Sequence, residues 1–181
     1  MYHQTGDERY LQAAMKCGEF FLRAQNPNGS WSYKWSQSAG MGMSARGYPQ
    51  GGELNDGTIN DGIFIMALMH HMTGERKYVD ALKRAGEWLL DAQMTGVTVG
   101  WAQQYNAENE PVEARIFEPA AWSWQGTEYA CQALGELYRF SGDERFVGAI
   151  ERTLTWIRET SPDGEMHSYY DPETGRPIAA W

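Results

Sequence analysis

The stretch TGDERY at residues 5–10 returns as TGERKY at residues 73–78 and as SGDERF at residues 141–146. The glycines of the three copies are separated by 68 residues each time. A fixed period over three copies predicts a structural repeat. In each copy a small residue and a glycine suit the end of one helix, and the acidic residue after them suits the start of the next.

Apolar residues follow each copy at helical spacing, as in the series Tyr78, Ala81, Leu82, Ala85 and Leu89. Second helices are expected between the copies, from about Asp61 to Met72 and from about Thr127 to Phe140. The sequence therefore predicts an all-α fold of helical hairpins, whose simplest closed packing is a ring of inner and outer helices. Strand signals are weak and confined to Val97, Val99 and the Tyr169-Tyr170 region.

The register also bears on the first hairpin. His70 in the second copy corresponds to Tyr2, so the chain begins at the last turn of an expected helix. We expect one domain over residues 1–181 whose first hairpin is incomplete, either because an N-terminal portion is missing or because the ring is open.

Composition excludes several classes of protein. A formal net charge of -9 argues against nucleic acid as a partner, because nucleic-acid-binding proteins carry a basic face. The sequence contains no run of 18 apolar residues, so it does not indicate a membrane span. The two cysteines, Cys17 and Cys131, lie among apolar residues of expected helices and are typical of core positions.

Six segments occur in the order seen in family 10 pectate lyases: AQNPNGSWSY (24–33), GYPQGG (47–52), TINDG (58–62), GWAQQY (100–105), EARIFEPAA (113–121) and YYDPETGRPI (169–178). The chain resembles polysaccharide lyase family 10 over nearly its whole length. The resemblance implies an (α/α)3 toroid that cleaves polygalacturonate by β-elimination, using calcium and an arginine base, which would be Arg115. We expect a monomer that works outside the cell or in the periplasm, although no signal peptide is visible.

The chemistry of β-elimination explains the residue types. Removing the C5 proton beside a uronate requires a cation to mask the carboxylate, and calcium bound by protein oxygens suits an acidic protein with an acidic polymer. Asp61 and Glu118 are the expected calcium ligands. A neutral guanidine at pH 9 costs about 5 kcal/mol, so the role of Arg115 as base rests on the resemblance. A plain salt bridge between Arg115 and Glu118 is the alternative.

The remaining candidates for substrate binding lie in loops or at a helix start: Asn60, Asp61, Trp31, Trp101, Gln104, Tyr105 and Arg176. Each has a structural alternative. Asp61 suits a helix cap, the aromatic residues suit a core as well as a sugar platform, and Arg176 is either an exposed charge or a carboxylate fork. Which of Asn60 and Asp61 binds the metal is left open.

Two other functions remain open. A hydrolase of unsaturated uronides needs an acid pair, for which Asp61 and Glu118 are the candidates. A noncatalytic sugar-binding or scaffold protein fits Glu113, which stands where the resemblance leads us to expect an aromatic residue. A carboxylate next to the base would discourage a bare polyanion.

Overall fold

The computed structural model describes residues 2–179 and is built mainly of helices. The helices are α1 (Tyr2–Thr5), α2 (Glu8–Ala24), α3 (Thr58–Thr73), α4 (Arg76–Asp91), α5 (Trp124–Ser141) and α6 (Glu144–Thr160), with a short 3-10 turn η1 (Asn55–Gly57) before α3. The second helices of the hairpins begin three residues earlier than the sequence predicts.

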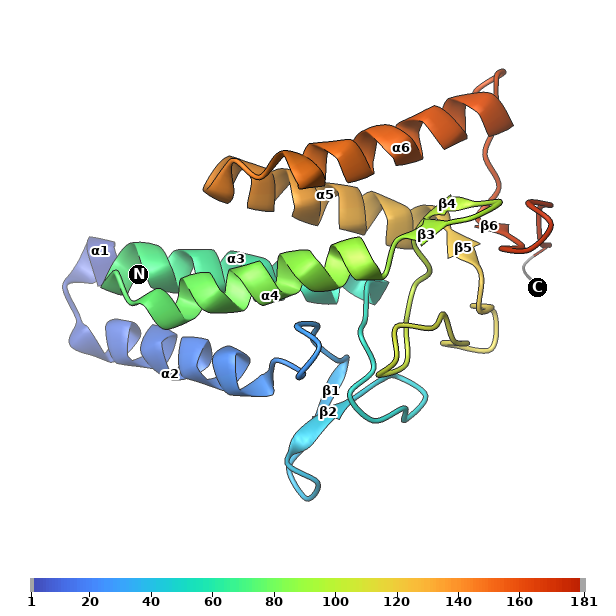
Figure 1. Cartoon of the computed structure of the whole chain (residues 1–181). Coiled ribbons are helices and arrows are strands. Elements are labelled where there is room, and N and C mark those ends of the chain that lie inside the picture. The colour runs from blue at the N-terminus through green and yellow to red at the C-terminus, as the bar shows by residue number, and fades with distance from the viewer. Residues whose placement is uncertain (1, 180–181) are drawn as a thin grey trace.

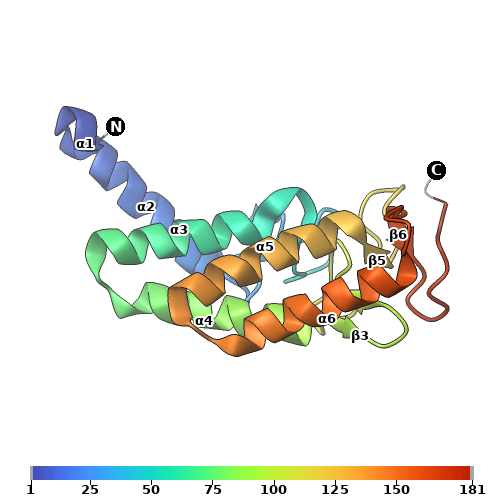
Figure 2. The same ribbon diagram turned by 90° about the horizontal axis from the view of Figure 1, so that it is seen from above.

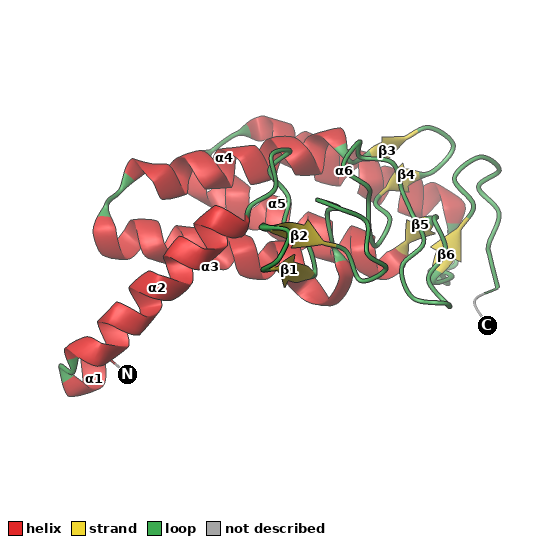
Figure 3. Ribbon diagram, turned by 90° about the horizontal axis from the view of Figure 1, so that it is seen from below, coloured by secondary structure: helices red, strands yellow, loops and turns green. Residues whose placement is uncertain are grey.

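The helices form three hairpins arranged as part of an α/α toroid (Figure 1). In the first hairpin α1 has 4 residues, where α3 has 16 and α5 has 18. Helices α3 and α5 lie side by side, and α2 and α6 lie at opposite edges of an open arc. Helix α2 runs obliquely to the others, as Figures 2 and 3 show. The predicted all-α fold of 68-residue hairpins with a short first member is confirmed.

The repeated turn has the expected chemistry. Gly6, Gly74 and Gly142 have φ of 67°, 69° and 71°, the left-handed conformation that favours glycine. The amides of Gly74 and Gly142 close the preceding helices onto carbonyls four residues back. Asp7 and Asp143 each accept a hydrogen bond from the backbone amide two residues on, at 3.0 Å, and so cap the helix that follows.

Contacts between hairpins repeat with the sequence. Lys77 forms an ion pair with Glu19 at 2.7 Å, and its equivalent Arg145 pairs with Glu87 at 2.6 Å. The side-chain amide of Gln93 donates to the Ala149 carbonyl at 2.8 Å, as that of Gln25 does to Ala81 at 2.9 Å. The 68-residue period is therefore a period of tertiary contacts as well as of residue types.

Three antiparallel strand pairs lie beyond the C-terminal ends of α2 and α4 (Figure 1). They are β1 (Lys34–Ser36) with β2 (Met41–Met43), β3 (Met94–Thr95) with β4 (Val99–Gly100), and β5 (Trp122–Ser123) with β6 (Tyr169–Tyr170). The signals at Val99 and Tyr169-Tyr170 mark real strands, and Val97 lies in the turn between β3 and β4. The other strands escaped sequence reasoning because each has only two or three residues.

The core lies between the helices and under these loops. Its largest fully buried side chains are Trp88, Trp101, Trp122, Tyr78, Tyr105, Leu54, Ile59, Met66, Met69, Leu82, Leu89 and Leu134. Within residues 2–179, no helix combines the length and the apolar character needed to cross a bilayer.

Candidate functional site

Two hollows at the loop end of the helices flank Arg115. One has a volume of about 350 Å³ and is lined by Tyr33, Lys34, Asp56 and Asp61, among others. The other has a volume of about 340 Å³ and is lined by Arg46, Glu113, Arg115 and Phe117, among others. A narrow recess lined by Tyr33, Asp56 and Arg115 lies between them. Charged groups of both signs and exposed aromatic rings thus line three neighbouring hollows that share lining residues.

Arg115 is held by a tight local turn. The backbone amide of Glu118 donates to the carbonyl of Arg115 at 2.8 Å, and the Glu118 carboxylate accepts from the amide, Nε and Nη2 of Arg115 at 2.7 to 2.9 Å. The arginine side chain remains 42% exposed, whereas that of Glu118 is 2% exposed. Hydrogen bonding to Glu118 raises the pKa of Arg115 above its usual range. The predicted salt bridge is present and favours the charged form of Arg115.

Asp56 approaches Arg115 from the start of α3. One carboxylate oxygen lies 3.5 Å from Nη2 of Arg115, and the side chain is 45% exposed. The backbone of Asp56 has a φ of 52°, which is uncommon for a residue other than glycine. Strained backbone of this kind clusters at functional sites. Sequence reasoning missed Asp56, although Asn55-Asp56-Gly57 stands directly before the helix start as a second copy of the Asn-Asp-Gly motif at 60–62.

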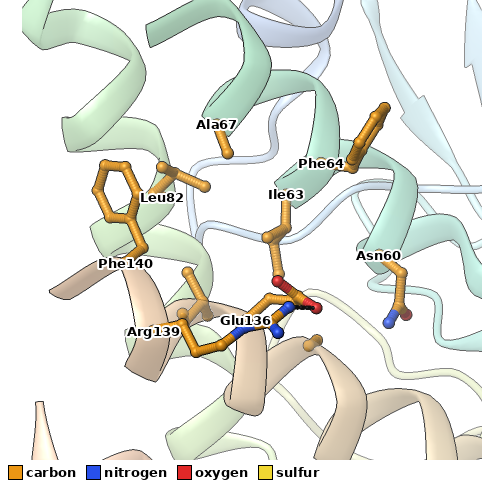
Figure 4. A pocket seen from close by; sticks show the side chains of 10 residues that line it. Asn60, Ile63, Phe64, Ala67, Leu82, Glu136, Arg139 and Phe140 are labelled. Atoms are coloured by element: carbon orange, nitrogen blue, oxygen red, sulfur yellow. Dashed lines mark hydrogen bonds and ion pairs between the residues drawn. The ribbon is translucent and has the colours of Figure 1, made fainter. Parts of the chain in front are cut away.

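Asn60 and Asp61 lie on different faces of α3. Successive residues of a helix point about 100° apart, and Asp61 lines the hollow with Asp56. Asn60 instead donates to the carbonyl of Tyr129 in α5 at 3.1 Å. It lines a separate, mostly apolar hollow between α3, α4 and α5, together with Phe64 and Phe140 (Figure 4). The structure therefore assigns Asp61 to the candidate site and separates Asn60 from it.

Three aromatic candidates lie in the core. The side chains of Trp31, Trp101 and Tyr105 are 2%, 0% and 0% exposed. The indole nitrogens of Trp31 and Trp101 each donate at 2.8 Å to a carbonyl in the last turn of the preceding helix, those of Phe21 and Leu89. A ring must present a face to stack on a sugar, so burial favours the core role over the predicted sugar-facing role. Trp31 is also among the residues that line the larger hollow.

The aromatic residues that follow α2 have two different roles. Trp31 folds back to cap the helix that ends at Ala24, while Tyr33 is 46% exposed and faces the hollow.

Gln104 and Arg176 have different surroundings. The Gln104 side chain is fully buried and its amide donates to the carbonyl of Glu113, so it holds the segment that carries Arg115 in place. Burial favours this structural role, and direct substrate binding by Gln104 stays a prediction. Arg176 lies exposed on the turn after β6, and its backbone carbonyl accepts from Asp171 at 2.8 Å. Its role as a carboxylate fork stays a prediction.

Buried polar side chains lie next to the candidate site. Glu53 is fully buried, and one of its carboxylate oxygens accepts from the amide of Ala45 at 2.9 Å. Its other oxygen, both polar atoms of the Asn55 side chain and the Gln104 carbonyl oxygen have no hydrogen-bond partner. Burial raises the pKa of Glu53 to about 7, with the charge of Glu118 adding to the effect. Buried polar groups without a partner are rare in folded proteins, so their presence next to a hollow indicates a candidate functional site.

The residues present fit calcium only in part. The oxygens of Glu118 accept from Arg115 and, at a longer distance, from the side-chain amide of Gln103, which favours the salt bridge over a metal. The role of Glu118 as a calcium ligand stays a prediction. Asp61 and Asp56 line one hollow and leave carboxylate oxygens open. No group of three or more His, Cys, Asp or Glu side chains suited to a metal occurs in the described part of the chain. Two carboxylates need further oxygens for calcium, which a uronate ligand can supply.

Comparison with known proteins places the fold. No protein-family model and no curated relative matches the sequence. Among solved structures, family 10 polysaccharide lyase from Cellvibrio cellulosa is similar with a TM-score of 0.78 and 16% identity over 97% of this chain and 62% of that chain. An aspartate-to-alanine mutant of that enzyme, in complex with trigalacturonic acid, has a TM-score of 0.76 and 15% identity over 97% and 63%.

Cellobiose 2-epimerase from Spirochaeta thermophila is also similar, with a TM-score of 0.67 and 18% identity over 99% of this chain and 44% of that chain. The chain thus spans about three fifths of the lyase and less than half of the epimerase. At these identities the likeness establishes the fold, an α/α toroid shared with a polysaccharide lyase and a sugar epimerase.

Proposed function

We propose that this chain binds and cleaves an acidic polysaccharide such as polygalacturonate by β-elimination. The observation that carries the proposal is the position of Arg115, which joins two solvent-open hollows on a toroid similar to a lyase that binds trigalacturonic acid. An arginine fork suits a uronate carboxylate. Exposed aromatic faces at Tyr33 and Phe117 suit pyranose rings on either side.

The reaction removes the C5 proton, forms the C4–C5 double bond and breaks the bond from C4 to the glycosidic oxygen, which leaves with a proton. As base, Arg115 must first lose its own proton, and the ion pair with Glu118 opposes that loss. As a cation, Arg115 stabilises the charge that develops on the uronate. The base role is the proposal, and charge stabilisation by the same residue is the alternative.

Calcium would be held by Asp56 and Asp61 together with the substrate's own carboxylate. When bound, it would mask the uronate charge and so favour loss of the neighbouring proton. An acid-pair hydrolase is less well supported, because Asp61 and Glu118 do not line a common hollow and Glu118 is paired with Arg115.

Turnover of polygalacturonate, followed by the ultraviolet absorbance of the unsaturated product, tests the proposal. Arg115→Lys keeps the charge and loses the planar fork, so we expect turnover to fall at least about a hundredfold with a much smaller change in affinity. Arg139→Lys is the matched control, because Arg139 also pairs with a glutamate three residues away.

The pH profile separates the two roles of Arg115. A base must be neutral, so activity should rise steadily up to about pH 10. A flat alkaline profile with the same loss in Arg115→Lys would assign the charge-stabilising role. Binding without any unsaturated product would show a sugar-binding protein, and near wild-type turnover in Arg115→Lys would remove Arg115 from the chemistry.

A further inference from the structure

Arg46 and Glu113 form an ion pair across the rim of the hollow that contains Arg115. Nη1 of Arg46 lies 2.9 Å from Oε2 of Glu113, and the two side chains are 47% and 62% exposed. The pair joins two loops that lie far apart in the sequence. Arg46 stands in the tight turn between Ser44 and Gly47, and Glu113 precedes the segment that carries Arg115.

The same hollow therefore contains two guanidinium groups, each covered by a carboxylate of the protein. Glu118 covers Arg115 through a buried carboxylate with several hydrogen bonds. Glu113 covers Arg46 through a single hydrogen bond at an exposed position. Exposed ion pairs are weak, because water screens the attraction and two long side chains lose freedom. A ligand carboxylate can therefore replace Glu113 at Arg46 with little net cost in free energy.

The wall of the hollow agrees with a sugar ligand. Arg115 lies 5.6 Å from the centre of the Phe117 ring, which is 46% exposed. Neighbouring Ile116 is 96% exposed and Pro119 completes an apolar side. An apolar wall opposite charged forks matches a pyranose ring that carries a carboxylate.

We propose that Arg46 is a second carboxylate-binding residue for an acidic sugar chain, and that Glu113 occupies Arg46 until that ligand arrives. This inference rests on the proposed function, because it assigns a further uronate to the same site. Glu113 then acts as an internal competitor that selects for ligands carrying a carboxylate. It does not repel the polyanion as an unpaired carboxylate would, because Arg46 balances its charge.

Calorimetric affinity for trigalacturonic acid tests the proposal in the whole chain. We expect Arg46→Gln to weaken binding about tenfold and Glu113→Gln to strengthen it several-fold. The opposite signs are decisive, since a pair that only tethers two loops would lose affinity when either partner is changed. Arg46→Lys keeps the charge, and we expect it to weaken binding by less than Arg46→Gln but measurably, through loss of the fork.

Arg139→Gln and Glu136→Gln are the controls for long-range charge, because this exposed pair lies away from the site. If the affinity for trigalacturonic acid changes no more in the Arg46 and Glu113 variants than in these controls, the proposal is overturned. Weaker binding in Glu113→Gln would overturn it as well. Affinity for the neutral trisaccharide cellotriose should not respond to any variant. Wild-type binding without cleavage would refute the lyase function alone, whereas absence of wild-type binding would refute both.

Discussion

At the scale of single residues, the candidate site depends on carboxylates whose partners differ. The Glu118 carboxylate is buried and saturated by Arg115, Asp56 is half-exposed with one long contact, and Asp61 is exposed at the first turn of α3. No hydrogen bond caps that helix through a side chain, so the capping role predicted for Asp61 is not what the structure shows. Its carboxylate remains open toward the hollow. There the positive end of the helix dipole stabilises its negative charge.

The proposed calcium site predicts metal-dependent binding. Asp61→Asn and Asp56→Asn should each weaken the calcium-dependent affinity for trigalacturonic acid about tenfold or more, because each removes a charged oxygen ligand. Calorimetry with calcium and with excess chelator measures the effect. Asp91→Asn, at an exposed position at the end of α4, should behave as the wild type. Equal affinity with calcium and with chelator would contradict the calcium proposal.

Glu53 predicts a specific dependence of stability on pH. Its pKa is raised from 4.5 to about 7 in the folded chain, so the folded state binds a proton more tightly than the unfolded state. The cost of ionising Glu53 is therefore absent below about pH 4.5, grows as the pH rises to about 7, and reaches about 3 kcal/mol above that. Glu53→Gln removes this cost and keeps an oxygen to accept from Ala45.

Urea unfolding of Glu53→Gln at several pH values tests this expectation. The variant should gain stability relative to the wild type as the pH rises from 5 to 8. Glu108→Gln, at an exposed loop position, should show no such trend. A constant difference between Glu53→Gln and the wild type across that range would show that the buried carboxyl does not titrate there.

At the scale of elements, one contact joins each outer helix to the next hairpin. Gln93, which follows α4, donates to the Ala149 carbonyl and to Thr153, and accepts from Arg152 at 2.6 Å. Gln25, which follows α2, makes the equivalent contacts with Ala81 and Arg84. These glutamines satisfy carbonyls that face neighbouring helices, and so they set the distance between successive outer helices.

The two glutamines provide a matched pair for stability measurements. Gln93 is 6% exposed and Gln25 is half-buried. Gln93→Ala leaves buried partners unpaired and should lower the free energy of unfolding by about 2 kcal/mol, against about 1 kcal/mol for Gln25→Ala. Chemical denaturation measures both. An equal or negligible loss at the two positions would mean that the repeated contact is not a significant source of stability.

At the scale of the whole molecule, an acidic chain carries a site with three cations, Lys34, Arg46 and Arg115. Lys34 and Arg46 lie close together, since Nζ of Lys34 donates to the carbonyl of Ala45 at 3.4 Å, and Arg115 comes from a distant segment. The same hollows are lined by four carboxylates, those of Asp56, Asp61, Glu113 and Glu118, so the three cations lie in acidic surroundings like those of the chain as a whole. Figure 3 shows the β3–β4 and β5–β6 pairs together at one end of the helices, whereas β1–β2 lies nearer their middle, beyond the end of α2.

The fold was predictable from local residues because the 68-residue period acts through local chemistry. A glycine with positive φ at Gly74 or Gly142 ends a helix wherever it stands, and an aspartate such as Asp143 begins the next one. Helical spacing then fixes which face of each helix is apolar. Hairpins, their order and the short first member follow from the sequence alone.

The candidate site was only partly predictable, because it depends on which way loop side chains point. Arg115 and Asp61 were found from their motifs. The contact of Asp56 with Arg115 and the Arg46–Glu113 pair emerge only when segments 59 and 67 residues apart along the chain are brought together. The exposure of Tyr33 is likewise decided by the fold. Composition could not separate a buried Trp101 from an exposed Tyr33, since both are loop aromatics. The sequence by itself determined the helical repeat, whose signals are local; only the tertiary structure decided burial and ion pairing, which are properties of contacts between distant segments.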